Sequence, residues 1–128
     1  SMRESCRVRQ PRTNTPLQAL ALMNDTTFVE ASRALAERAY REARGLNARL
    51  THIFHLATGR KPSRRESLII SLGYRRHLNH YREHPKEAKK LIHTGASKPM
   101  KRVNPAELAA LTTVAGLILN LDEVVTNE

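Results

Sequence analysis

The sequence predicts an all-α fold, with four to six helices in a bundle-like array around an apolar C-terminal helix. Apolar residues recur at spacings of three and four through most of the chain, which is the period of an amphipathic helix. Residues that cap helices stand in front of several of these segments. No segment shows the alternation of polar and apolar residues that is typical of a half-buried strand. The chain has 128 residues, which is the length of one domain.

Residues 1–14 predict a basic, extended lead-in to a single helical domain over residues 15–128. The lead-in carries four arginines and almost nothing apolar. Ser1 and Met2 resemble a cloning remnant, and the chain then starts abruptly at Arg3. We therefore expect a domain taken from a longer protein, so missing targeting signals say little about location.

A polar break at residues 24–27 separates the first two predicted helices. Thr15 can cap a short first helix, Pro16 suits its first position, and Gln18 completes a capping box. Asp25 can start the second helix, and Gly45 is expected to end it. The face of this second helix that we expect to turn inward consists of Phe28, Ser32, Leu35, Ala36 and Ala39.

The middle of the chain predicts two further helices and a short third one. Asn47 is expected to cap a helix that Gly59 ends in a left-handed conformation. Its apolar stripe is Leu50, Ile53, Phe54 and Ala57. A capping box at residues 63–66 begins the next helix. We expect its buried stripe to consist of Leu68, Ile69 and Leu72. Pro85 limits that helix and opens a short one that ends before Gly95.

The last predicted helix is apolar nearly all round. Residues 96–103 predict an exposed loop, after which Asn104 and Pro105 form a helix start. The apolar residues that follow are Leu108, Leu111, Val114, Ala115, Leu117, Ile118, Leu119 and Leu121. A helix without a polar face is a central, buried one, so we expect the other helices to surround it.

The charge of the chain is strongly positive and unevenly distributed. Lys and Arg number 22 against 12 acids, a net charge of +10. All the basic residues precede Val103, where only eight acids oppose them, so this body carries +14 and the remaining tail −4. Such a field attracts polyanions, although a solvated surface is the plainer interpretation. The residues of the predicted basic face are Arg60, Lys61, Arg64, Arg65, Arg75 and Arg76.

Nucleic-acid binding is one alternative for this basic face. Its arginines and lysines could neutralise phosphates. Stacking aromatics, which single-strand binding usually requires, are scarce here, with no Trp, two Phe and three Tyr. A helix-turn-helix remains open, but no helix offers an evident set of base-reading side chains.

Histidines are the other residues with a chemistry of their own. His77, His80 and His84 would share one face of the fourth helix, and His52 and His55 form a second pair. If these faces met, the imidazoles could ligate a metal or haem, but exposed histidines are the plainer interpretation. The single cysteine, Cys6, excludes an internal disulfide, a haem-attachment motif and a zinc ribbon. We predict no catalytic residue, no cofactor in this fragment and no membrane span.

Three motifs resemble the C-terminal part of the planctomycete-type PSD domain of unknown function. The first is residues 12–20 (RTNTPLQAL) with the following Met23-Asn24-Asp25 and Phe28-Val29. The second is the turn at residues 57–62 with Glu66, and the third runs from residue 107 to residue 123. The structural motif residues singled out by this resemblance are Arg12, Asn14, Thr15, Gln18, Asn120, Asp122 and Glu123. Arg12 is expected to clamp Asp122 or Glu123, which would join the first motif to the last.

The resemblance implies a piece of a large, exported protein, in an extracytoplasmic or periplasmic setting. Members of this family often carry cytochrome-c-like domains upstream, so any haem would belong to that missing part. We therefore expect a non-catalytic helical domain that packs on the upstream domains and binds an anionic partner such as a sulfated polysaccharide. The alternatives are a nucleic-acid-binding module and the metal- or haem-binding part of a redox enzyme.

Overall fold

The computed structural model describes residues 25–126, and side chains up to residue 121. Within this range the order of elements is α2 (Thr26–Glu42), α3 (Leu46–Thr58), α4 (Arg64–Glu83), α5 (Pro85–Ile92) and α6 (Pro105–Thr126), with no strand. The predicted all-α fold is confirmed. The short helix predicted at Thr15, Pro16 and Gln18 lies outside the described residues.

Three of the predicted caps lie at helix ends, at Asp25, Ser63 and Gly59. The Asp25 carboxylate accepts a hydrogen bond from the Phe28 backbone N–H, and Ser63 and Glu66 form a complete capping box. Gly59 ends α3 in the left-handed region, with φ at 84°. Two predicted ends were wrong by a few residues. Gly45 does not end α2, which stops at Glu42; its φ of 88° reverses the chain so that α3 starts before Asn47.

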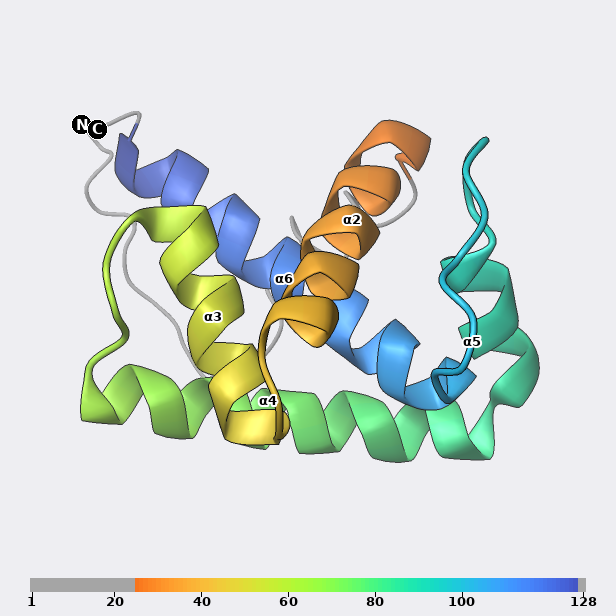
Figure 1. The fold of residues 1–128 in the computed structure, drawn as a ribbon, viewed down its shortest axis with the longest axis horizontal. Coiled ribbons are helices and arrows are strands. Elements are labelled where there is room, and N and C mark those ends of the chain that lie inside the picture. Colours follow the sequence, from red (N-terminus) through yellow and green to blue (C-terminus); the bar gives the residue numbers. More distant parts are fainter. Residues whose placement is uncertain (1–24, 127–128) are drawn as a thin grey trace.

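Helix α6 is the centre of the fold. It packs against each of the other four described helices, and in Figure 1 it runs diagonally behind α2 and α3, with α4 along one side. Residues on every side of α6 are buried, among them Leu108, Ala109, Ala110, Leu111, Val114, Ala115 and Ile118. Its apolar sequence has no polar face to present to water, so surrounding helices must cover it. The predicted central position is confirmed.

A buried arginine joins α2 to the loop between α5 and α6. The Arg33 side chain is 2% exposed. Its terminal nitrogens donate to the backbone carbonyls of Ile92 (2.5 Å), Thr94 (3.2 Å) and Ser97 (3.0 Å), and also to the Ser97 hydroxyl. Its Nε lies 3.4 Å from a Glu37 carboxylate oxygen. The burial of Arg33 was not predicted from the sequence, since an arginine on the edge of an apolar stripe is ordinarily exposed.

Two acids of α2 complete the attachment of this loop. Glu37 accepts from the Met100 backbone N–H at 2.8 Å, and Glu30 accepts from the Ser97 backbone N–H at 3.1 Å. The second of these bonds is the main cause of a lowered Glu30 pKa. The loop therefore has fixed partners, and it brings α6 back under α2.

Candidate functional site

The outer face of α4 carries three exposed apolar side chains. Leu68 is 60% exposed, Ile69 42% and Leu72 53%. We expected these three to form the buried stripe of α4, and that prediction was wrong. The helix instead turns a second stripe inward: Tyr74 is buried, and Ile70, Leu78 and Tyr81 pack partly buried against the core. This inner stripe is longer and contains two tyrosines, so it buries more apolar area against α6.

A hydrogen bond fixes the rotation of α4 on α6. The Tyr81 hydroxyl lies 3.1 Å from Thr113 Oγ1, and Thr113 itself donates to the Ala109 carbonyl. The tyrosine is therefore the donor to the threonine oxygen. With Tyr81 held inward, the Leu68 side of α4 has to face outward.

Arginines frame the exposed apolar side chains at both ends. Arg64 and Arg65 lie one turn before Leu68, whereas Arg75 and Arg76 lie one turn after Leu72. All four arginines are exposed. Residues spaced by three, four, seven and eleven share one side of a helix, so apolar and basic groups form a single surface about 18 Å long. We call the seven residues Arg64, Arg65, Leu68, Ile69, Leu72, Arg75 and Arg76 the outer α4 face.

The six predicted basic residues are not equivalent. Arg60 forms a two-pronged pair with Glu66, at 2.9 and 2.8 Å, so its charge is largely neutralised. This pair lowers the pKa of Glu66 to about 2, with help from the Ser63 backbone N–H. In the part of the chain that the structure describes, no acid pairs with Lys61, Arg64, Arg65 or Arg75. Among the six, Lys61, Arg64, Arg65 and Arg75 are thus the residues whose charge is available to a partner.

A hollow lies beside the outer α4 face, between α3 and α4. Its volume is about 360 Å³. Leu50, Pro62, Leu68 and Ile70 supply apolar walls, and the remaining lining residues are Asn47, Thr51, Ser67 and Ser71. Leu68 therefore belongs both to the exposed surface and to the rim of a recess, into which an apolar side chain of a partner could fit.

The five candidate histidines do not converge on one centre. His52 Nε2 pairs with Glu42 at 2.7 Å, which lowers the pKa of that carboxyl, and His55 is exposed on the same helix. His77 is half-buried, and burial lowers its pKa. His77 lies toward the inner stripe rather than on the solvent side where we expected it, because α4 is rotated as described above. His80 and His84 are exposed, as expected.

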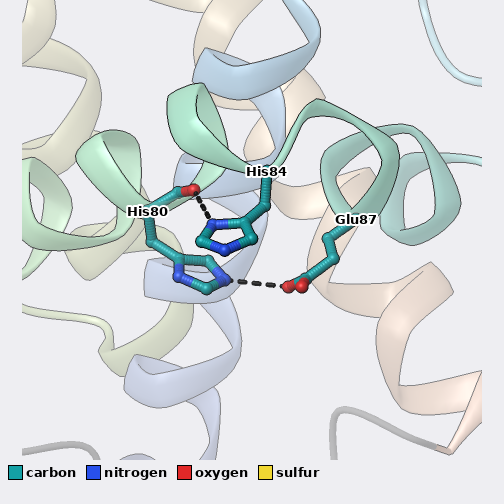
Figure 2. A group of neighbouring side chains, drawn as sticks. All are labelled: His80, His84 and Glu87. Carbon is teal, nitrogen blue, oxygen red and sulfur yellow. Dashed lines mark hydrogen bonds and ion pairs between the residues drawn. The ribbon is translucent and has the colours of Figure 1, made fainter.

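His80 and His84 lie together where α4 turns into α5, as Figure 2 shows. Their rings stack with centroids 4.3 Å apart and planes 22° apart. Glu87, from the first turn of α5, accepts from His80 Nε2 at 2.8 Å, and this bond is the main cause of a lowered Glu87 pKa. One ligand atom from each of His80, His84 and Glu87 can be chosen so that all lie within 4.8 Å of one another. Glu87 was missed by the sequence reasoning, because its place beside His80 depends on the turn of the chain at His84.

Of the seven structural motif residues near the chain ends, the structure describes the side chain of one, Asn120. Arg12, Asn14, Thr15 and Gln18 lie outside the described residues, as do the side chains of Asp122 and Glu123. The predicted clamp between these two groups therefore stays a prediction. Asn120 is 5% exposed on α6, and its role in the motif stays a prediction.

Among the described residues, no helix has the length and apolar character needed to cross a membrane.

Comparison with known proteins yields one family. The model of PSD1, a protein of unknown function (DUF1553), matches residues 1–72. This range includes the first two motifs of the resemblance and ends before the third. No curated protein and no solved structure matches the chain.

Proposed function

The chain belongs to the PSD1 family of proteins of unknown function (DUF1553), and we propose that it is a non-catalytic docking domain whose outer α4 face packs against an upstream domain of the same parent protein. The observation that carries this proposal is the exposure of Leu68, Ile69 and Leu72 on one side of α4. Scattered exposed leucines are ordinary, but a contiguous apolar patch with a polar rim marks an interaction site.

The layout of the outer α4 face matches that of a protein interface. Such interfaces have an apolar centre and a polar rim, and they are enriched in arginine. Here the centre is Leu68 with Leu72, and the rim is a pair of arginines at each end. Helix α4 carries five arginines against two glutamates, a net charge of +3. The complementary partner is therefore an acidic protein surface with exposed apolar side chains.

The apolar centre distinguishes this proposal from a purely ionic one. A sulfated polysaccharide or a nucleic acid would be held by the arginines, and water-exposed leucines would add little to it. Since about half of each leucine side chain is still exposed, its burial by a protein partner contributes on the order of 1 kcal/mol. Two leucines together then account for about a 30-fold difference in affinity.

The test is binding of the chain to the remainder of its parent polypeptide, supplied as a separate protein. We expect Leu68→Asp with Leu72→Asp to weaken binding at least about 30-fold. These substitutions lie on exposed positions, so circular dichroism should show an unchanged fold. Binding should also weaken when Arg64, Arg65 and Arg75 are changed to Gln, with a smaller dependence on salt.

The matched control removes the same charge from another helix. Lys86, Lys89 and Lys90 are exposed on α5, and changing all three to Gln should leave binding unchanged. An equal loss of affinity in the arginine triple variant of α4 and the lysine triple variant of α5 would show that the outer α4 face is not the binding surface. Unchanged binding of the Leu68→Asp, Leu72→Asp variant would do the same.

Three other probes separate the alternatives. Heparin or duplex DNA could instead bind selectively. If that binding disappears when the arginines are replaced and does not change when Leu68 and Leu72 are replaced, a polyanion-binding function would replace this proposal. Concentration-dependent self-association that Leu68→Asp abolishes, measured by sedimentation, would show that a second copy occupies the face. Either result would overturn the proposal as stated.

A further inference from the structure

We propose that His80, His84 and Glu87 form a binding site for one divalent transition-metal ion, such as Zn²⁺, at the corner between α4 and α5. Two imidazoles and one carboxylate are a ligand set that zinc, copper and nickel accept, whereas calcium and magnesium require oxygen ligands. The site is distinct from the outer α4 face.

The chain itself orients the His84 ring. His84 Nδ1 lies 2.9 Å from the His80 backbone carbonyl. A carbonyl oxygen can only accept, so Nδ1 carries the proton and Nε2 of the neutral ring keeps its lone pair. A hydrogen bond from one ring nitrogen to a carbonyl is the usual support for a metal-binding histidine, because it fixes the tautomer and the direction of the other nitrogen.

His80 and Glu87 already share one proton at a position that a metal ion could take. His80 Nε2 donates to the Glu87 carboxylate at 2.8 Å. On binding, the metal replaces this proton. In a neutral His80 ring the proton moves to Nδ1, and an imidazolium ring releases its extra proton to water.

To hold one ion, the two stacked imidazole rings must rotate so that their in-plane lone pairs converge. Bonds of about 2.0–2.1 Å in a tetrahedral zinc site bring ligand atoms to about 3.3 Å from one another. The three ligand atoms lie within 4.8 Å in the ion-free arrangement, and Figure 2 shows all three side chains directed toward one region. All three residues are exposed, so rotation meets little steric resistance and water can complete the coordination.

Position in the fold explains why these three residues meet and His77 does not. His80 belongs to the last turn of α4, His84 is the corner residue with non-helical φ and ψ (−129° and 67°), and Glu87 belongs to the first turn of α5. The corner folds the His84 ring back onto His80.

The test is titration of the full chain with Zn²⁺ by calorimetry, in a Cys6→Ser background so that the thiol cannot contribute. We expect one ion per chain and no heat with Mg²⁺. His80→Gln and His84→Gln should each lower the zinc affinity at least about tenfold, since loss of a mere supporting partner already costs that much. Glu87→Gln should lower it as well. Proton NMR should show shifted ring resonances for these two histidines alone.

His93 offers a closely matched control. Its Nδ1 lies 2.8 Å from the Lys89 carbonyl, the same local hydrogen bond as that of His84, but among the described residues His93 belongs to no group of three possible metal ligands. His93→Gln and His55→Gln should leave zinc binding unchanged. Zinc affinity that survives His80→Gln with His84→Gln, or that falls equally with His93→Gln, would overturn the proposal. Absence of any zinc binding by the Cys6→Ser chain would overturn it too.

Discussion

Replacing the buried arginine of α2 is expected to destabilise the fold strongly. Arg33→Met keeps an unbranched apolar stem and removes the guanidinium group with its charge and donors. Three backbone carbonyls, those of Ile92, Thr94 and Ser97, would lose their donor. Glu37, which is 13% exposed, would lose its ionic partner.

The expected loss of stability follows from burial. Removing one member of a buried, hydrogen-bonded charge pair costs about 3–5 kcal/mol, because the remaining groups are left desolvated and unpaired. A domain of this size is stable by only about 5–15 kcal/mol. Arg33→Met should therefore remove a large share of the free energy of unfolding. Arg33→Lys should recover little, because one ammonium group cannot reach three carbonyls spread over six residues.

Urea unfolding followed by circular dichroism at 222 nm measures this effect directly. The control is Arg38→Met on the same helix. Arg38 is 56% exposed and pairs with Glu42 one turn on, so its replacement should cost less than about 0.5 kcal/mol. A loss below about 1 kcal/mol for Arg33→Met, or equal losses for the two variants, would show that Arg33 does not hold the loop.

Three further predictions follow from local geometry. The Glu66 pKa of about 2 lies below its ordinary value of 4.5, so this carboxylate stabilises the fold above pH 4.5 and loses that effect as the pH falls toward 2. Because Glu66 is about one-third exposed, screening reduces the effect to about 1 kcal/mol, and Glu66→Gln should remove this part of the pH dependence in urea titrations at pH 7 and pH 3. Gly95→Ala should lower the melting temperature, since φ is +96° and the added carbon would lie 2.1 Å from Glu30 Cδ, whereas Gly73→Ala, with open space in a helix, should raise it. Asn104→Ala should cost about 1 kcal/mol in the same unfolding assay, because Asn104 accepts from the Ala106 and Glu107 backbone N–H groups at the start of α6.

Local signals in the sequence were sufficient to predict most helix ends and the central helix. Ser63 with Glu66, Gly59 and Asn104 each act through neighbours within a few residues, so their role can be recognised without a fold. The same holds for α6, whose composition leaves it no exposed face. These features require no knowledge of tertiary contacts.

The orientation of α4 could not be predicted in this way, because its sequence carries two apolar stripes. Leu68, Ile69 and Leu72 form a short one, and Ile70 and Tyr74 begin a longer one. Both have helical spacing, so periodicity alone does not decide which is buried. The decision comes from area: the longer stripe extends along α6 and includes two tyrosine rings. Because the shorter stripe stays exposed, it supplies the apolar part of the outer α4 face.

Long-range polar contacts likewise could not be predicted from the sequence. Arg33 finds its partners about 60 residues away in the chain, and nothing near it signals a buried position. His80 and His84 were identified as candidate ligands, but Glu87 joins them only because the chain turns at His84.

The apolar centre of the outer α4 face and the metal corner share α4 and should nevertheless act independently. Leu72 and His80 are eight residues apart on the helix, which corresponds to about 12 Å, whereas Arg76 lies only four residues, or about 6 Å, from His80. Effects at sites separated by more than about 10 Å without common partners usually add. Zinc bound at His80, His84 and Glu87 should therefore change the loss of affinity caused by Leu68→Asp with Leu72→Asp by less than about twofold, as measured by calorimetry with and without a chelator. A larger change would mean that the metal corner and the apolar centre of the outer α4 face form one surface.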